Sequence, residues 1–420
     1  MEGERTALVL AGGGARGAYE AGALSLLLPE LERRGQRPTV YAGTSVGAIN
    51  AVMLASMAHL PAPEAAGRLV ALWEQLSKGD VIRPILRRQG PLAALRFAGE
   101  LMSVPGVRLA SVLDPTPLHA SLDRWIDWDA LHRNVADGVV ETVAAVCTSA
   151  RTGRSVVFVE EAEERVFNRS HAVAYVAARV EREHVLASAA IPVLFPPIKV
   201  SSPPRARGWY FDGGTRLNAP IKPALDLGAD RLVVIASDSI AGPTMELDSD
   251  SDGEAPPDLA DGVLHLIEGA LVDPLIEDMR TLGNVNAFFA EGDQTGPRLY
   301  RSVRGKAPYR RVPYVFVGPA ARGAVGRLAA SVFAERYGGL RGALRAPDFQ
   351  MIMRLIGGES ATSGELLSLL FFDPAFTGAL IALGREDASR WLADMHDGGE
   401  GPWQIGPLAN FVMPRQWTAG

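Results

Sequence analysis

One serine in the sequence has the neighbours of a nucleophile. Ser45 lies in Gly43-Thr44-Ser45-Val46-Gly47, which matches the pattern GxSxG between a short β-type run and a helical segment. A sharp strand-to-helix turn holds such a serine in a strained conformation, and flanking glycines remove side chains that would collide there. The spacing therefore predicts that Ser45 is a nucleophile and that Gly43 and Gly47 support its turn. The alternative is an ordinary tight turn without chemistry.

A glycine-rich loop precedes this serine in the chain. Gly12-Gly13-Gly14-Ala15-Arg16-Gly17 follows a short apolar run and opens a helical segment, so its backbone N–H groups can approach an anion closely. One interpretation is an oxyanion hole for a nucleophile elsewhere in the chain. Another is the dinucleotide fingerprint GxGxxG, which predicts an acidic residue at the end of the next strand. That strand leads into Ser45 instead, and Glu30 and Glu32 fall within a helical segment, which disfavours a nucleotide-binding oxidoreductase.

Asp212 is the residue best placed to act as the base that a nucleophilic serine needs. It ends a β-type run at 209–211 and is followed by Gly213 and Gly214, so its carboxylate can lie in a cleft with room for a substrate beside it. A carboxylate with a pKa of about 4 is a weak base at neutral pH, but burial raises that pKa. We therefore predict a dyad of Ser45 and Asp212, supported by the two glycines.

Two alternatives to this dyad stay open. Asp397 also precedes two glycines, but it follows Met395-His396 rather than a β-type run, so its context is that of a loop. A Ser–His–Asp triad requires a histidine, and none of the seven histidines lies in a motif expected of a triad. His265 and His396 are the candidates for a hidden triad.

The composition excludes several other classes of protein. The 420 residues carry a net charge of −6, which argues against a nucleic-acid binder that works by phosphate attraction. Hydrophobic residues make up 47% of the chain, which is too apolar for a disordered protein. A single cysteine, Cys147, excludes an intramolecular disulfide and a cysteine-rich zinc site. No apolar run approaches the roughly 20 residues of a membrane-spanning helix, and the N-terminus lacks signal-peptide features, so we expect a cytoplasmic protein.

Short β-type runs alternate with helix-length segments through the first 240 residues, which predicts βαβ units and a mostly parallel sheet covered on both faces. The predicted strands are 7–11, 40–42, 141–148, 155–160, 209–211, 231–237, 298–303 and 312–317. The predicted helices include 18–34, 46–58, 62–76, 91–102, 264–289, 327–337 and 365–370. Residues 241–262 are acidic and rich in Pro, Gly and Ser, which predicts an exposed, mobile loop.

Taken together, the motifs resemble those of the patatin-like phospholipase family. They occur in the family's order: the loop at 12–17, the serine motif at 43–47, the run 187–197, Asp212-Gly213-Gly214 and Asn218-Ala219-Pro220. The resemblance covers roughly residues 5–320. It implies an α/β protein with a three-layer α/β/α patatin-like fold and a mostly parallel central sheet. It also implies a catalytic domain over 1–320, which contains the loop 241–262, followed by a mainly helical C-terminal extension over 321–420.

The resemblance also implies a function, namely a serine lipid acyl hydrolase that cleaves esters of phospholipids or related lipids without a cofactor or metal. By this resemblance Ser45 is the nucleophile and Asp212 the base, and the amides around Gly13, Gly14 and Ala15 form the oxyanion hole. Arg16 then supports the loop or helps to hold a phosphate or carboxylate. The alternative is a latent or inactive patatin-like protein that binds lipid or a partner.

One segment has the composition of a membrane contact. Residues 81–111 interleave five arginines with Leu, Ile, Phe and Met, which is typical of a basic amphipathic segment at an anionic interface or of a lid. The alternative is a solvated helix that packs its apolar face on the domain. We expect peripheral membrane contact through this segment and no nucleic-acid partner. The oligomeric state stays open.

Overall fold

The computed structural model describes residues 4–84, 113–162, 173–192, 194–240, 273–291, 295–303, 310–338, 361–398 and 401–408. The strands in these ranges are β1 (Thr6–Leu10), β2 (Pro38–Thr44), β3 (Arg83–Pro84), β4 (Leu113–Asp114), β5 (Thr142–Ser149), β6 (Ser155–Glu161), β7 (Val173–Ala177), β8 (Ile198–Val200), β9 (Gly208–Asp212), β10 (Arg231–Ile235) and β11 (Tyr314–Val317). The helices are α1 (Gly17–Arg33), α2 (Val46–Ser56), α3 (Ala62–Gln75), α4 (Lys78–Val81), α6 (Thr116–Trp125), α7 (Trp128–Ala136), α8 (Arg182–Ser188), α9 (Ile221–Asp226), α11 (Asp273–Glu291), α12 (Thr295–Ser302), α13 (Ala324–Tyr337), α16 (Ala361–Leu370) and α17 (Pro374–Ala393).

A mixed sheet lies at the centre of the fold, in the strand order β11-β10-β1-β2-β5-β6-β7. Neighbouring strands from β11 to β5 are parallel, β6 is antiparallel to β5, and β7 is parallel to β6. Strand β9 pairs antiparallel with the end of β5, and β8 pairs with β9. The prediction of a mostly parallel sheet is therefore confirmed.

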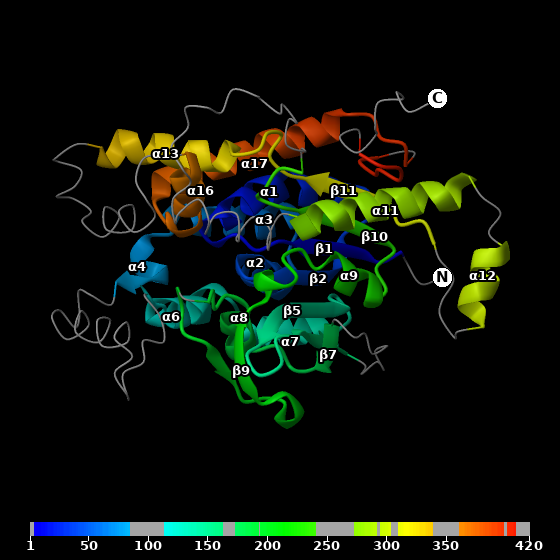
Figure 1. Cartoon of the computed structure of the whole chain (residues 1–420), viewed down its shortest axis with the longest axis horizontal. Helices are drawn as coiled ribbons and strands as arrows, with labels where there is room; N and C mark the ends of the chain where they lie inside the picture. The colour runs from blue at the N-terminus through cyan, green and yellow to red at the C-terminus, as the bar shows by residue number, and fades with distance from the viewer. Residues whose placement is uncertain are drawn as a thin grey trace, which may run out of the picture.

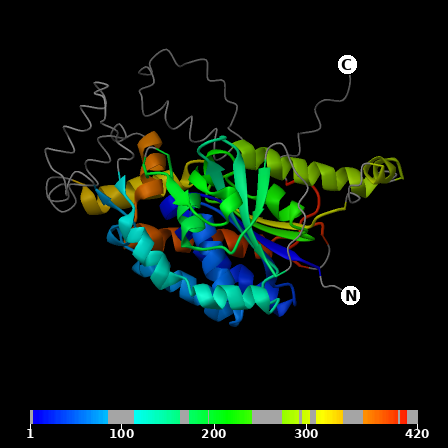
Figure 2. The same ribbon diagram turned by 90° about the horizontal axis from the view of Figure 1, so that it is seen from below.

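Helices cover both faces of the sheet, because the strands are apolar on both sides. In β1, Leu8 and Leu10 pack into a cluster with α1, α2 and α3, whereas Ala7 and Val9 pack into a second cluster with α9 and α11. A strand buried on both faces is a continuous apolar run, as expected for parallel strands. Figure 2 shows α11 on one side of the sheet and the blue helices of the early chain on the other. The three-layer α/β/α arrangement is confirmed.

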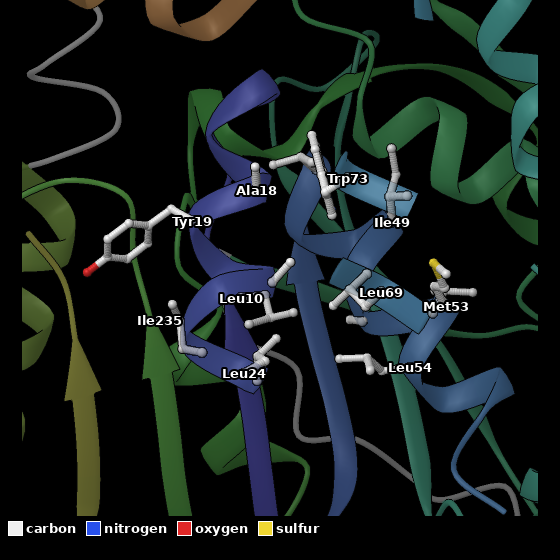
Figure 3. Close-up of a cluster of buried hydrophobic side chains, with 14 of the residues drawn as sticks. Leu10, Ala18, Tyr19, Leu24, Ile49, Met53, Leu54, Leu69, Trp73 and Ile235 are labelled. Atoms are coloured by element: carbon white, nitrogen blue, oxygen red, sulfur yellow. The ribbon is translucent and has the colours of Figure 1, made fainter. Parts of the chain in front are cut away.

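Figure 3 shows the larger cluster from close by: Leu10 of β1, Leu24 of α1 and Leu69 of α3 gather between the sheet and the helices, and all three are fully buried. Trp73 and Ile49 lie farther along the same layer, toward the end of the sheet at which β2 passes into α2. The packed core therefore continues up to the place where the predicted nucleophile lies.

Most of the predicted elements are confirmed, with small shifts at their ends. The strand predicted at 298–303 is wrong, because α12 (Thr295–Ser302) occupies these residues. A six-residue run that mixes apolar and basic residues fits either period, so pattern alone does not distinguish strand from helix there. The helix predicted at 91–102, the acidic loop at 241–262 and residues 264–272 of the helix predicted at 264–289 lie outside the described residues.

Helix α17, near the C-terminus, packs on α1, the first helix of the chain (Figure 1). The crossing of α17 over α1 is close: a Cβ on Gly22 would lie 2.2 Å from the carbonyl oxygen of Ile381, and a Cβ on Gly384 would lie 2.1 Å from that of Tyr19. The Tyr19 hydroxyl donates to Asp387 of α17 over 2.8 Å. Helix α17 is therefore part of the packed core, although the domain boundary expected near residue 320 stays a prediction.

No single described helix is long and apolar enough to cross a membrane. One bent pair, Gly364–Leu370 with Pro374–Ala393, meets the length and composition criteria together at an angle of 103°. Its apolar side chains are used inside the protein, since Phe376, Leu380 and Ile381 are at most 2% exposed.

Candidate active site

Ser45 lies in a strained turn between β2 and α2. Its backbone has φ 55° and ψ −126°, the only positive φ of a non-glycine residue in the described part of the chain. Such a conformation costs on the order of 1–3 kcal/mol and persists only where the surroundings hold it. Here the Ser45 N–H donates to the Ser188 hydroxyl oxygen over 2.9 Å, and that hydroxyl donates to the Val146 carbonyl over 2.6 Å.

The two glycines of the GxSxG motif are required by close backbone contacts. A Cβ on Gly47 would lie 2.3 Å from the Leu10 carbonyl oxygen, and a Cβ on Gly43 would lie 2.2 Å from the Gly47 carbonyl oxygen. Strand β1 and helix α2 therefore approach each other more closely than any side chain permits. This contact brings the start of α2 against the end of β1, from which the glycine-rich loop leaves.

Asp212 reaches Ser45 because β2 and β9 share one edge of β5. Strand β2 pairs with Thr142–Val146, and β9 pairs antiparallel with Cys147–Ser149 just beyond it. The ends of β2 and β9 therefore meet, and the Ser45 side chain lies close enough to the Asp212 carboxylate to affect its pKa. Both residues are 4% exposed.

The pKa of the buried Asp212 carboxyl group lies near neutral pH. Burial raises its pKa from 3.8 to about 7, although hydrogen bonds from the Ser45 side chain and the Gly214 N–H oppose the shift. The Gly214 N–H lies 2.7 Å from Oδ1 and fixes the orientation of the carboxyl group. A base with a pKa near the working pH combines a useful fraction of the ionised form with a useful basicity.

The last residue of α8 and the turn that follows it hold both members of the predicted dyad. Ser188 accepts the Ser45 N–H, and the Ala190 carbonyl accepts the Asp212 N–H over 2.9 Å. Sequence analysis identified the run 187–197 only as part of the resemblance and gave Ser188 no role. Its position in a run of small residues ahead of Asp212 was the only signal in the sequence.

The glycine-rich loop passes directly beside Ser45, since a Cβ on Gly12 would lie 3.0 Å from the Ser45 Cβ. Three of its N–H groups are used within the fold. Gly12 donates to Asn218, Arg16 donates to the Gly13 carbonyl, and Gly17 donates into the short 3-10 turn that begins at Gly14.

The remaining N–H groups of this loop are those of Gly13, Gly14 and Ala15, which have no acceptor among the described residues. They are therefore the donors available to an anion beside Ser45. Of the six loop residues predicted to form the oxyanion hole, only these three have backbone N–H groups without an acceptor among the described residues. The other three predicted residues, Gly12, Arg16 and Gly17, hold the loop in shape.

Arg16 does not face the site as a free cation. Its guanidinium is buried and forms ion pairs with Asp238 and Glu365, and its Nε donates to the Ser368 hydroxyl over 2.8 Å. Of its two predicted roles, this geometry favours support of the loop over binding of a phosphate. Sequence analysis missed all three partners, because Ser368 is 352 residues away in the chain and no local pattern connects such positions.

An apolar pocket opens beside Ser45. Apolar side chains from several helices and loops line the pocket, among them Ile49, Met53, Trp73, Leu118, Phe195, Leu369, Leu370 and Phe372. The one other polar residue of the wall besides Ser45 is Asn50, whose side chain is used by Glu20 and by the Trp73 indole N–H. The pocket therefore suits a hydrocarbon chain.

The alternatives to Asp212 lie elsewhere or outside the described residues. Asp397 accepts the N–H groups of Ile405 and Gly406, in a loop that pairs with Tyr314. Tyr314 lies at the amino end of β11, whereas Ser45 follows the carboxyl end of the parallel strand β2, so the two aspartates lie at opposite ends of the strands. His396, next to Asp397, stacks on Trp391. His265 is not among the described residues.

Nothing in the site has the features of a dinucleotide or metal centre. Strand β2 ends at Thr44, so the acidic residue that a dinucleotide site requires is absent at its end. Within the described residues, no group of three or more His, Cys, Asp and Glu side chains is arranged to hold a metal ion.

Comparison with known proteins identifies the family. A family model for patatin-like phospholipase matches residues 8–225, just over half of the chain. The chain therefore belongs to the patatin-like phospholipase family, and at the level of the family it is a lipid hydrolase. The match covers Ser45, Asp212 and the glycine-rich loop, and it ends well before α13, α16 and α17.

No curated protein sequence matches the chain. Among solved structures, VipD from Legionella pneumophila is 13% identical, with coverage of 92% of this chain and 85% of that chain. The TM-score of that superposition is 0.27, so it supports no conclusion about the site.

Proposed function

We propose that this chain is a serine acyl hydrolase that cleaves fatty-acyl esters of phospholipids or related lipids through a dyad of Ser45 and Asp212. The observation that carries the proposal is the position of Ser45 at an apolar pocket, close to the buried carboxylate of Asp212. The glycine-rich loop beside Ser45 offers three N–H groups that have no acceptor among the described residues.

The reaction follows from these positions. The acyl chain enters the apolar pocket and brings its ester carbonyl to Ser45, while Asp212 accepts the hydroxyl proton. The Ser45 oxygen attacks the carbonyl carbon, and the N–H groups of Gly13, Gly14 and Ala15 donate to the developing oxyanion, which is worth about 3–4 kcal/mol for each donor. The C–O bond to the alcohol breaks, and Asp212 returns the proton to the leaving oxygen.

Hydrolysis of the acyl-enzyme repeats the same steps with water as the nucleophile. Asp212 accepts a proton from the water molecule, which attacks the acyl carbonyl, and the same three N–H groups hold the second oxyanion. The Ser45 oxygen leaves with a proton from Asp212, and the fatty acid is released. None of these steps requires a cofactor.

The segment predicted to contact the membrane begins beside the pocket. Residues 85–111 of the predicted segment 81–111 lie outside the described residues. Its described start belongs to the site, since Val81 lines the pocket, and Arg83–Pro84 pairs antiparallel with Leu113–Asp114. We propose that the segment contacts the lipid surface from which the substrate comes, and that the protein acts from the cytoplasm at that surface.

Hydrolysis of phospholipid vesicles tests the proposal. The native chain should release fatty acid from phosphatidylcholine–phosphatidylglycerol vesicles, and Ser45→Ala should lower the rate by at least about 10⁴-fold, since the nucleophile is lost. Long-chain esters should exceed butyrate esters in kcat/KM, because each buried methylene contributes about 0.8 kcal/mol.

The controls are His396→Ala and His265→Ala, which should keep near-native rates. Activity that survives Ser45→Ala contradicts the proposed nucleophile, and loss of activity in either histidine variant would favour a triad. A native chain inert toward every ester would favour the alternative of a latent or inactive lipid-binding protein.

A further inference from the structure

The buried guanidinium of Arg16 is the link between the glycine-rich loop and the C-terminal helices. Arg16 is 5% exposed, and each of its three guanidinium nitrogens has a partner. A buried cation requires compensating charge, and both carboxylates that provide it, on Asp238 and Glu365, lie beyond the part of the chain that the family model matches. Both carboxylates that pair with this arginine of the loop therefore come from segments outside residues 8–225.

Glu365 binds both Arg16 and the backbone at the start of α13. Its Oε2 accepts from Arg16 Nη2 over 2.6 Å, and its backbone carbonyl accepts from the same nitrogen over 3.0 Å. Its Oε1 accepts the Gly326 N–H at the start of α13 over 3.0 Å. Ser368, one turn later on α16, donates to the Glu365 carbonyl and accepts from Arg16 Nε. The carboxylate therefore joins α13, α16 and the glycine-rich loop.

Helix α16 also contacts the loop through its backbone. A Cβ on Gly14 would lie 2.2 Å from the carbonyl oxygen of Leu369, and Gly14 has φ +58°. Gly14 and Arg16 belong to one 3-10 turn. Because Gly14, Ala15 and Arg16 form this single turn, we expect a displacement of Arg16 to move the N–H groups of Gly14 and Ala15 as well.

We propose that Glu365 is a positioning residue for the oxyanion hole. It holds Arg16, and through Arg16 it holds the N–H groups of Gly13, Gly14 and Ala15 in the geometry that a tetrahedral oxyanion requires. The proposal rests on the proposed function, because an oxyanion hole matters only for acyl transfer. Glu365 does not line the pocket, so its effect falls on the transition state rather than on binding of the acyl chain.

The test compares Glu365→Gln with the native chain on phospholipid vesicles. Glutamine keeps the size of the side chain and an acceptor oxygen, but it removes the charge that compensates Arg16. We expect kcat per active site to fall on the order of tenfold to a hundredfold, since a misplaced donor loses part of the oxyanion stabilisation. KM and the affinity for a fluorescent fatty acid should change by less than about twofold. Active sites are counted by fluorophosphonate titration, so unfolded protein does not enter the rate.

Two further variants separate positioning from stability. Ser368→Ala removes one hydrogen bond to Arg16 and should lower kcat by a smaller factor in the same direction. Asp373→Asn is the matched control: this carboxylate caps α17 and accepts from the Tyr337 hydroxyl without touching Arg16. It should lower the unfolding temperature and leave kcat unchanged.

The outcomes are distinguishable. A Glu365→Gln protein with native kcat and a lower unfolding temperature overturns the proposal, as does a raised KM with native kcat. If Glu365→Gln fails to fold, Ser368→Ala decides, and native kcat in that variant overturns the proposal. A native chain that matches Ser45→Ala on vesicles refutes the proposed function itself, independently of Glu365.

Discussion

Asp212→Asn should lower kcat by about 10³–10⁴-fold, because the variant removes the only base within reach of Ser45 among the described residues. Asparagine keeps the shape of the side chain and its acceptor oxygen for the Gly214 N–H, so the fold should persist. The matched control is Asp397→Asn, which changes the other aspartate that precedes two glycines and should keep near-native activity.

The same variant should be more stable than the native chain at neutral pH. The folded-state pKa of Asp212, about 7, lies above its ordinary value of 3.8, so the unfolded chain loses this proton first as the pH rises. Stability therefore falls between about pH 4 and pH 7 and then stays constant, which amounts to at most about 4 kcal/mol. Asparagine does not ionise, so its advantage should appear at pH 8 and vanish near pH 4.

Urea unfolding at these two pH values measures the difference. A gain in stability together with a loss of activity indicates that the native residue serves catalysis and lowers the free energy of unfolding. Equal stability of the two proteins at pH 8 would show that the carboxyl group is not held in its raised-pKa state.

The pH dependence of kcat/KM should also follow the ionisation of Asp212. Below about pH 7 the carboxyl group is protonated in the free enzyme and cannot accept the Ser45 proton, so kcat/KM should fall about tenfold for each pH unit. Half of the carboxyl groups are ionised at a pH equal to the pKa, so the expected loss from pH 7 to pH 5 is about fiftyfold. An aspartate with an ordinary pKa would give a flat profile over this range.

A soluble short-chain ester is the substrate of choice for this profile, because it avoids pH effects on the vesicle surface. The residual activity of Asp212→Asn serves as the control and should lack the tenfold slope. A flat native profile from pH 5 to pH 8 would contradict the assignment of Asp212 as a base with a raised pKa. A slope that persists in Asp212→Asn would assign the ionisation to another group.

The parts of the site that follow local rules were predictable from the sequence. The turn at Ser45 and the loop at 12–17 each lie between a strand and a helix. Their glycines are required because neighbouring atoms leave no room for a Cβ. Asp212 was also predictable, since a strand end before two glycines is a local pattern. These segments are short, and their chemistry and conformation are encoded in adjacent residues.

The parts that depend on distant contacts were not predictable. No pattern connects Arg16 with Glu365, which lies 349 residues away, and the wall that Leu369 and Phe372 give to the pocket arises only when α16 packs on the loop. The pKa of Asp212 is set by burial, which is a property of the folded chain. The error at 298–303 has a similar origin, because a short mixed run takes its conformation from context.

Reaction with a long-chain fluorophosphonate, followed by peptide mass spectrometry, tests the central claim most directly. The reagent forms a covalent bond with an activated serine and mimics the tetrahedral intermediate. We expect a single adduct on the peptide that contains Ser45, and a much slower reaction in Asp212→Asn but not in Asp397→Asn. An adduct on another residue in a chain that hydrolyses lipid, or an Asp212→Asn protein that reacts at the native rate, would contradict it.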